Sequence, residues 1–485
     1  MYIDQFRAWM DAHEHEMTQD LKALIRIPSE RMEARPGMPF GPEAARALRT
    51  AKTMMEKYGL SVTDYDHYVV AGDMNPCPKG LDILAHLDVV PEGEDWTVTS
   101  AYVPVVRNGK IYGRGAMDNK GPAVAALYAM RAVMDLGIPL NKNVRLILGS
   151  DEESSSSDLE YYYARETEAP CTFSPDAEFP VINVEKGGLH SSFSKKFDGK
   201  AASGARLISA EAGTRVNVVP GKARALVSGI SMDVLKRLGG EVEKETKVRF
   251  SFANTYGAAG NENTLVKDGA CDGAVEITAI GSFAHAASPE DGNNALTALI
   301  LFISRLPLDD VSVKEAFSLI SSLYPHGDFY GNALGVAMSD EISGPLTMSL
   351  NMLTFGDGCL NASFDCRAPL CASDANVRDG IAKKLDAGGF CLDDRKMYAA
   401  HYVPGDSSFV KTLLSCYTDV TGLPGKTVAI GGGTYVHDLK YGVAFGCCME
   451  GVDNHLHGAD EFVDIEHLKT CAVIFAEAIV RLCGQ

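Results

Sequence analysis

Apolar positions follow helical spacing near the start of the chain and then gather in short runs separated by amphipathic stretches. Helical spacing predicts helices, and short apolar runs bounded by turn residues predict buried strands. Up to residue 186 the pattern predicts two helices, a strand, a helix and two more strands, in this order: 4–25, 42–59, 81–90, 122–137, 144–153 and 171–183. Strands that alternate with helices indicate a parallel sheet covered by helices.

The middle of the chain has a different pattern, in which segments such as 191–199 and 222–231 alternate polar and apolar residues with helices between them. This is typical of strands with one exposed face. The first pattern returns from about residue 399, with a helix, two strands and a last helix at 408–421, 427–433, 443–450 and 465–482.

The predicted fold class is therefore α/β. One domain, with a mostly parallel sheet flanked by helices, is expected from residues 1–186 and 399–485. An α+β domain is inserted between them at residues 187–398, and it is large enough for two subdomains.

Composition narrows the classes of function. The chain has 485 residues, of which 46% are hydrophobic and 22% charged, which is typical of a globular protein. The charged, amphipathic first residues contain no apolar core and no small-residue cleavage site, so they predict no signal peptide and a cytoplasmic location. A net charge of -19 argues against nucleic acid and anionic membranes as partners.

The twelve cysteines include no CxxC pair. We interpret them as small buried apolar residues in a reducing compartment.

Candidate chemistry begins with His86-Leu87-Asp88, at the end of the first predicted strand. Residues two apart on a strand face the same side, so Asp88 can hydrogen-bond His86 and fix which ring nitrogen meets a metal. The His-x-Asp pattern is weak on its own.

Asp118 lies in GRGAMDNKGP (113–122), a glycine-rich segment at the start of a predicted helix. It could serve as a helix cap. The functional alternative is a carboxylate held so that both of its oxygens face metals.

Three consecutive acids, Asp151, Glu152 and Glu153, end the strand at 144–153. They repel one another unless cations neutralise them, although a solvated acidic loop is the simple alternative. In the functional interpretation Glu153 binds a metal, and Glu152 takes a proton from the attacking water.

The last cluster is HGADE, which begins at His457, and we expect the nearby His455 to be structural. Together with Asp176 in SPDAEFP, the clusters supply two histidines and three carboxylates at strand ends. Such a set suits two divalent ions about 3.5–4 Å apart that share one carboxylate. Oxygen and imidazole ligands fit zinc, and also manganese or cobalt.

The motifs HLDVVPEG, GRGAMDNKGP, SDEE, FSPDAEFPVINVEKGG and HGADE, in this order and spacing, resemble those of the aminoacylase/carboxypeptidase-like family of dinuclear zinc peptidases. They look most similar to PepV-type (Xaa-His) dipeptidases, and the resemblance extends over essentially the whole chain. It implies that the two ends of the chain form a catalytic domain and that the insert is a lid.

The resemblance also implies a role for each residue of the metal site. His86 and Asp176 would hold one ion, Glu153 and His457 the other, and Asp118 would bridge them. A water between the ions would be activated by Glu152, and Asp88 would support His86. The peptide bond between Asp118 and Asn119 is expected to be cis.

Residues of the insert match as well. His285 in GSFAHAASPEDGNNA would stabilise the oxyanion, Asn217 in GTRVNVVP would contact substrate, and Arg367 in FDCRAP would bind the substrate carboxylate. Gly432, Gly433 and Thr434 in GGGT would face the same carboxylate end. A buried histidine and a surface ion pair are the simple alternatives for His285 and Arg367.

The leading hypothesis is thus a monomeric metallodipeptidase that acts on small peptides with a free C-terminus. A deacylase of N-acyl amino acids at the same two-metal site stays open, and so does a catalytically inactive binding protein with this fold. SSSSD after the acids, His437 after GGGTYV and the segment WTVTSAY depart from the family pattern. These departures leave the substrate preference open rather than the chemistry.

Overall fold

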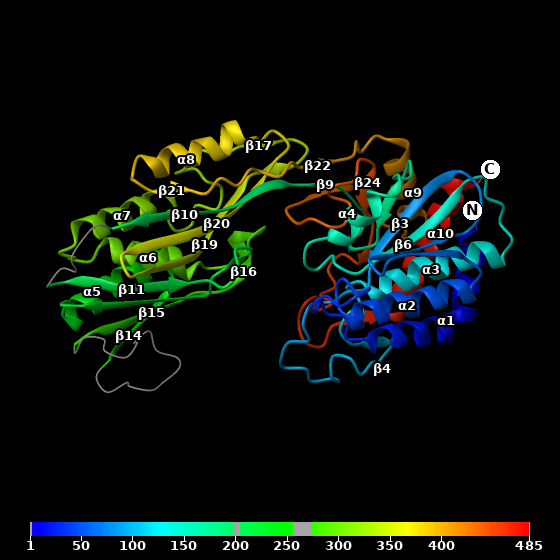
Figure 1. Cartoon of the computed structure of the whole chain (residues 1–485), viewed down its shortest axis with the longest axis horizontal. Coiled ribbons are helices and arrows are strands. Elements are labelled where there is room, and N and C mark those ends of the chain that lie inside the picture. The colour runs from blue at the N-terminus through cyan, green and yellow to red at the C-terminus, as the bar shows by residue number, and fades with distance from the viewer. Residues whose placement is uncertain (1, 198–203, 256–272, 485) are drawn as a thin grey trace. The chain divides into compact units, whose positions relative to one another are not determined.

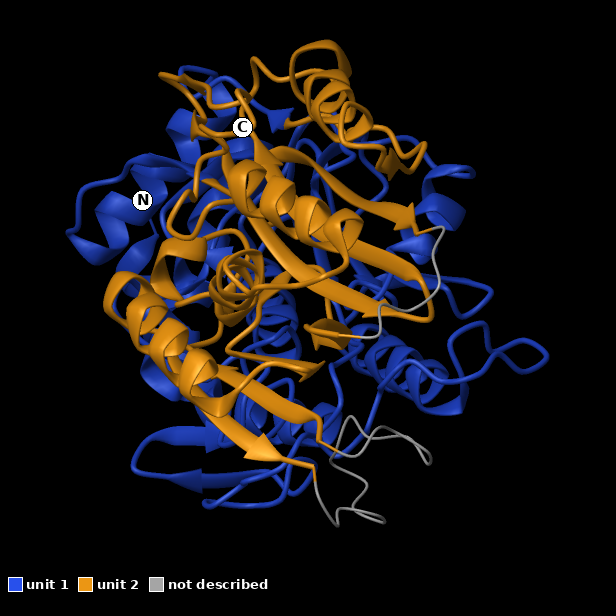
Figure 2. Cartoon of the chain, turned by 90° about the vertical axis from the view of Figure 1, so that its left-hand side faces the viewer, with its two compact units in different colours: residues 1–185, 401–429, 433–485 blue, residues 186–400, 430–432 orange. Residues whose placement is uncertain are grey.

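The structure, a computed structural model, describes residues 2–197, 204–255 and 273–484. It divides into two compact units, coloured separately in Figure 2. Unit 1 comprises Met1–Glu185, His401–Ala429 and Gly433–Gln485, and unit 2 comprises Lys186–Ala400 and Ile430–Gly432. The chain passes from unit 1 to unit 2 after Glu185 and back after Ala400, within two residues of the expected boundaries. The inclusion of residues 430–432 in unit 2 was not predicted.

Unit 1 is built around a nine-stranded sheet with the order β1-β2-β6-β3-β7-β24-β9-β22, to which β23 adds beside β9. The central strands β6, β3, β7 and β24 pair in parallel, as predicted, and the outer pairs are antiparallel. The bounds are β1 Ser61–Tyr65, β2 Val69–Asp73, β3 Lys79–His86, β6 Asn143–Gly149, β7 Thr172–Ser174, β9 Val181–Glu185, β22 His401–Tyr402, β23 Thr427–Ile430 and β24 Gly442–Ala444. Five short strands form two smaller sheets: β4 Val105–Arg107, β5 Lys110–Tyr112, β26 Phe462–Asp464, β8 Ala177–Glu178 and β25 Cys447–Cys448.

Most helices of unit 1 are close to those that the apolar spacing predicts: α1 Ile3–Ile25, α2 Pro42–Lys57, α3 Lys120–Asp135, α9 Ser408–Thr421 and α10 Ile465–Cys483. The short helix α4 Ser157–Tyr163 was not predicted. Helices α1, α3 and α10 pack on one another, and α3 and α10 also contact β3 (Figure 1). Nearly every residue of α3 is buried. Burial on all sides explains why its sequence is apolar all round rather than striped.

The predicted strands at 443–450 and 171–183 are both wrong as single elements. The first is divided into β24 and β25, which belong to different sheets. The segment 171–183 is divided further. The structure has three separate strands there, β7, β8 and β9. Pro175 follows β7, and a cis peptide bond joins Phe179 to Pro180 before β9. Proline has no backbone N–H and fixes φ, so it interrupts the hydrogen-bond ladder of a central strand.

Unit 2 has an antiparallel eight-stranded sheet with the order β14-β15-β13-β11-β19-β20-β10-β21. Its bounds are β10 Gly187–Lys196, β11 Arg206–Ala212, β13 Lys222–Ser228, β14 Arg249–Asn254, β15 Val275–Ile280, β19 Thr347–Gly356, β20 Cys359–Ala368 and β21 Cys391–Leu392. Helices α5 Met232–Thr246, α6 Ala295–Ser304, α7 Val311–Leu323 and α8 Asp379–Asp386 pack with it, and two short ribbons complete the unit: β12 Val218–Val219 with β16 Ala284–His285, and β17 Ser339–Asp340 with β18 Gly344–Pro345.

Each unit has its own apolar core. The core of unit 1 draws on α1, α3, α10 and the central strands, and that of unit 2 on the eight-stranded sheet and α6. The described residues of unit 2 share one sheet and one core rather than two, so the two subdomains expected in the insert are not separate bodies.

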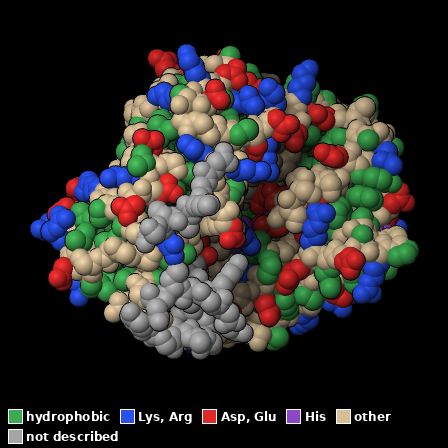
Figure 3. Space-filling model, turned by 60° about the vertical axis from the view of Figure 1, so that its left-hand side comes forward, with side chains coloured by type: hydrophobic (Ala, Val, Ile, Leu, Met, Phe, Trp, Pro, Cys, Tyr) green, Lys and Arg blue, Asp and Glu red, His purple; other side chains and the backbone are tan. Residues whose placement is uncertain are grey.

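Charged side chains of both signs are mixed over the face shown in Figure 3. Within the described ranges, no helix has the length and apolar character that a membrane span requires.

Candidate metal centre and active site

Three neighbouring parallel strands bring acidic and imidazole side chains to one edge of the unit 1 sheet. His86 is the last residue of β3 and pairs with Gly149, the last residue of β6. Residues 150–153 follow β6 directly, and Asp176 lies just beyond β7. The carboxyl ends of parallel strands meet at one edge of a sheet, so these distant residues come together there.

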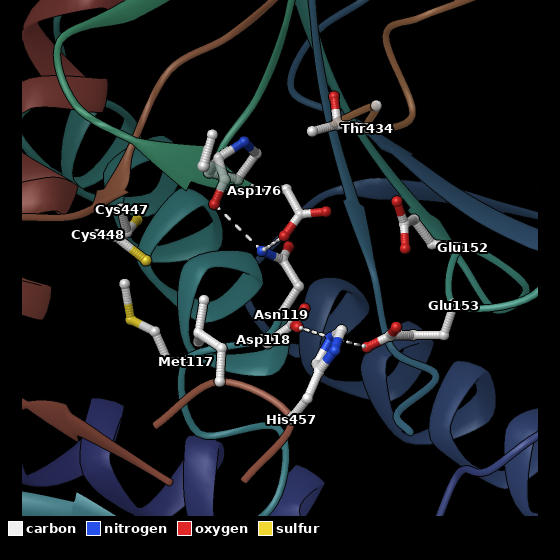
Figure 4. Close-up of a pocket in the computed structure, with 14 residues that line it drawn as sticks. Met117, Asp118, Asn119, Glu152, Glu153, Asp176, Thr434, Cys447, Cys448 and His457 are labelled. Atoms are coloured by element: carbon white, nitrogen blue, oxygen red, sulfur yellow. Dashed lines mark hydrogen bonds and ion pairs between the residues drawn. The ribbon is translucent and has the colours of Figure 1, made fainter. Parts of the chain in front are cut away.

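Asp118 lies between the two histidines and offers one carboxylate oxygen to each. Its Oδ1 is 3.1 Å from His86 Nε2, and its Oδ2 is 2.9 Å from His457 Nε2. Asp176 Oδ2 lies 3.4 Å from His86 Nε2, and Glu153 Oε1 lies 3.3 Å from His457 Nε2. Two groups of three residues therefore share Asp118: His86, Asp118 and Asp176, and Asp118, Glu153 and His457. Figure 4 labels the members of the second group.

These residues fit a pair of cations. In each group the candidate ligand atoms all lie within 4.8 Å of one another. His86 Nε2 and Glu153 Oε1 are buried without a hydrogen-bond partner among the described residues. Buried polar atoms are costly when unpaired, and one divalent cation in each group would pair both atoms.

The protonation pattern shows how strongly this cluster attracts positive charge. Burial alone would raise the pKa of Asp118, but the hydrogen bond with His457 and the nearby imidazole of His86 hold it well below its usual range. Contacts with Asp118 and Glu153 raise the pKa of His457 to about 10. Burial opposes charge on His86, yet Asp176 and Asp118 outweigh it and raise the pKa of His86. Metal ions compete with protons for such ligands.

Glu152 lines the same cavity as Asp118, Glu153 and Asp176 (Figure 4). Burial raises the pKa of Glu152 well above its ordinary value, and the carboxylate of Asp176 adds to the shift. A raised pKa makes the carboxylate of Glu152 a stronger base, which favours a role in general acid–base catalysis.

Asp88 supports His86 in a different way from that expected. The closest contact of His86 Nδ1 is the backbone oxygen of Asp88, at 3.1 Å, and the Asp88 carboxylate is 3.4 Å away. That carboxylate accepts the backbone N–H of Glu153 at 3.0 Å. A carbonyl oxygen can only accept, so Nδ1 carries the proton and Nε2 is left to face a cation.

A buried carboxylate that received no role in the sequence, Glu461, holds the loop that presents Asp118. Glu461 Oε1 accepts the N–H groups of Met117 and Asp118, at 2.9 and 3.1 Å. Its Oε2 accepts the N–H of Gly115 at 3.0 Å and Arg114 Nη1 at 2.8 Å. Glu461 lies in the HGADE motif, but its partners are more than 340 residues away in the chain, and no local pattern points to them.

Asn119 completes the frame. Its Nδ2 donates to Asp176 Oδ1 at 2.9 Å and to the backbone oxygen of Pro175 at 3.1 Å. The peptide bond between Asp118 and Asn119 is cis, which confirms the prediction.

Part of the GGGT turn faces the same cavity. Gly433 and Thr434 line it together with the acids and an apolar wall that includes Met117 and Cys448, around a volume of about 240 Å³ (Figure 4). Thr434 is held by the buried Glu185, which accepts both its N–H and its hydroxyl, at 3.2 and 2.8 Å.

The other predicted substrate residues, Asn217, His285, Arg367 and Gly432, lie in unit 2. Asn217 and His285 are neighbours on the β12–β16 ribbon, where the Asn217 backbone oxygen accepts the Ala286 N–H. His285 is exposed, so the buried-histidine alternative is wrong.

Arg367 is largely buried. It makes a bidentate pair with Asp365 at 2.7 and 2.9 Å and donates to the Gly431 backbone oxygen at 2.9 Å. It could reach a substrate carboxylate only with N–H groups other than these three.

Comparison with known proteins agrees with this geometry. The model of the peptidase family M20/M25/M40 matches residues 83–481. YtjP of Bacillus subtilis (strain 168) is 33% identical over 471 residues, which cover 96% of this chain and 97% of that protein. The beta-Ala-Xaa dipeptidase of Lactobacillus delbrueckii subsp. lactis is 32% identical over 482 residues, 98% of each chain.

The crystal structure of an aminoacylhistidine dipeptidase from Vibrio alginolyticus covers 97% of both chains with a TM-score of 0.58. At 13% identity this match shows a common fold. The family match and the two relatives cover nearly all of the sequence, and together they establish that the chain belongs to the peptidase family M20/M25/M40.

Proposed function

We propose that this protein is a two-metal dipeptidase that hydrolyses dipeptides with a free C-terminus. The observation that carries the proposal is the pair of ligand groups that share Asp118, with Glu152 in the same cavity. The beta-Ala-Xaa dipeptidase, similar over 98% of its length, supports dipeptides as the substrate class.

The proposed cofactor is a pair of divalent ions, most simply zinc, with manganese or cobalt as alternatives that suit the same ligands. His86 and Asp176 would hold one ion, Glu153 and His457 the other, and Asp118 both. When bound, the ions would supply Lewis acidity and lower the pKa of water at the site.

Glu152 would act as the general base and then as the general acid. Its carboxylate would take the proton of the attacking water and return it to the leaving amino group. The buried, acid-rich surroundings raise the pKa of Glu152 and so strengthen it as a base, in the direction that this step requires.

The remaining residues would bind the substrate. His285 would donate to the carbonyl oxygen as negative charge develops on it, and Asn217 would contact the substrate beside it. Gly432, Gly433 and Thr434 would surround the terminal carboxylate, with Arg367 fixing the terminus.

The decisive experiment compares a free dipeptide with its N-acetyl counterpart, using purified protein loaded with zinc or manganese. We expect hydrolysis of the free dipeptide at the higher kcat/KM and its loss on chelation. Faster cleavage of the N-acetyl compound would favour the deacylase. No hydrolysis of either compound, at a metal content of two ions per chain, would favour an inactive binding protein.

A further inference from the structure

Asp158 and Tyr435 are buried polar residues, and neither is a proposed metal ligand or the proposed general base. Asp158 Oδ2 accepts three donors: the Ser150 N–H at 2.6 Å, the Asp151 N–H at 3.0 Å and the Tyr435 hydroxyl at 2.5 Å. Both side chains are excluded from solvent. Two of these hydrogen bonds fix the backbone that donates them, and the third fixes the Tyr435 side chain.

That backbone leads directly to Glu152. Asp158 holds the two residues before Glu152, and the Asp88 carboxylate holds the residue after it through the Glu153 N–H at 3.0 Å. Glu152 therefore lies between two points at which buried carboxylates restrain the main chain. Its position in the cavity depends on both.

The end of β6 is shaped to allow this contact. A Cβ on Gly149 would overlap both the Tyr435 hydroxyl oxygen and Asp158 Oδ2. The Tyr435 ring also stands edge-on to His86, with centroids 6.0 Å apart. A glycine at this position lets the tyrosine and the aspartate meet directly behind the loop of acids.

We propose that Asp158 and Tyr435 are positioning residues that set the place of Glu152 in the cavity. This inference rests on the proposed function, since Glu152 is placed as its general base. Tyr435 links the turn that carries Thr434 to the loop that carries Glu152, so two walls of the cavity are fixed by one hydrogen bond.

The substitution Asp158→Asn tests the role with little change in shape. Asp158 Oδ1 already accepts the Leu159 N–H at 2.8 Å, and Oδ2 accepts the other three donors. In either orientation, the asparagine NH₂ group faces an N–H or O–H donor. The loop must shift, and a misplaced general base lowers the rate of the chemical step.

We would measure kcat, KM and bound metal for D158N and Y435F beside the wild type. D158N should lower kcat at least about 10-fold, with KM within about twofold and two ions retained, because substrate and metal contacts are left intact. Y435F should lower kcat by a smaller factor, about threefold, because two of the three donors remain.

Asp82→Asn is the matched control. Asp82 is a fully buried aspartate on β3 that accepts one backbone N–H, from Ala169, and it does not line the cavity. Its kcat should equal that of the wild type. A similar loss of kcat in D82N would attribute the effect to the removal of any buried carboxylate from unit 1, rather than to the contacts of Asp158, and would overturn the inference.

The outcomes separate this inference from the proposed function. A wild-type protein that holds two metals but cleaves no dipeptide defeats both. An active wild type with D158N unchanged in kcat, or with D158N depleted of metal, defeats only the positioning role. If D158N does not fold, Y435F decides: unchanged kcat at full metal content overturns the inference, and a loss of kcat alone supports it.

Discussion

Replacing Glu461 with glutamine should lower both the stability of unit 1 and its affinity for metal. The carboxylate accepts four donors, and both it and Arg114 are almost completely buried. A glutamine keeps one acceptor oxygen and brings an NH₂ group against N–H donors of the loop that presents Asp118. Arg114 would also lose its ionic partner in the interior.

The burial of the Glu461–Arg114 ion pair determines the expected loss of stability. Removing one partner of a buried ion pair costs about 3–5 kcal/mol. For a unit of this size that corresponds to a fall in the unfolding midpoint of roughly 6–20 °C. Displacement of a loop that orients a ligand typically weakens metal binding by about 10–100-fold.

The assay needs two measurements, thermal unfolding of the apo protein and metal titration at equilibrium. Glu477→Gln is the control: Glu477 is also buried, and it accepts an arginine, Arg481, and a backbone N–H, that of Tyr2. Both variants should lose stability, but only E461Q should lose metal affinity. Equal metal affinity in E461Q and wild type would refute the reasoning that Glu461 orients Asp118.

Three further predictions concern charge in the interior. Asp118→Asn leaves one oxygen where two are needed, so the metal content after desalting should fall from two ions to one or none; a content of two would contradict a shared ligand. Chelation should lower the unfolding midpoint, because ions present at about 1,000 times their dissociation constant stabilise the fold by about 4 kcal/mol, and an unchanged midpoint would contradict it. Burial raises the pKa of Asp82 to about 6, so its ionisation costs native stability as pH rises from about 4 to 6, by up to about 3 kcal/mol above pH 6. Asp82→Asn should therefore be more stable than wild type at pH 8 and not at pH 4, and denaturant unfolding that shows the same difference at both pH values would contradict the sign.

Local sequence patterns were sufficient for elements that depend on local spacing. The helices α1, α3 and α10 and the strands β3 and β6 lie close to their predicted positions because each carries its own apolar pattern. The segment 171–183 was misjudged because apolar content does not reveal where proline breaks a ladder. The short return of residues 430–432 to unit 2 was not foreseen either.

The candidate site could be named from motifs because its ligands are side chains of distinctive type. The residues that hold these ligands in place could not be named from motifs. Glu461, Asp158 and Tyr435 act through hydrogen bonds to residues that are distant in the chain or that donate only backbone N–H groups, and such donors leave no mark in composition. For Arg367 the sequence indicated a charged group, but only the structure shows that Asp365 already pairs with it.

The interrupted path of the chain through unit 1 has a consequence for synthesis. Unit 2 can close once residue 400 has left the ribosome, apart from the three residues 430–432, while unit 1 still lacks β24, which lies between β7 and β9, and the helix α10. His457 is made 339 residues after Asp118. A nascent chain that has not reached His457, or one truncated before this point, therefore exposes an unfinished sheet and cannot assemble the second ligand group, so hydrolytic competence arises only after residue 457 has been made.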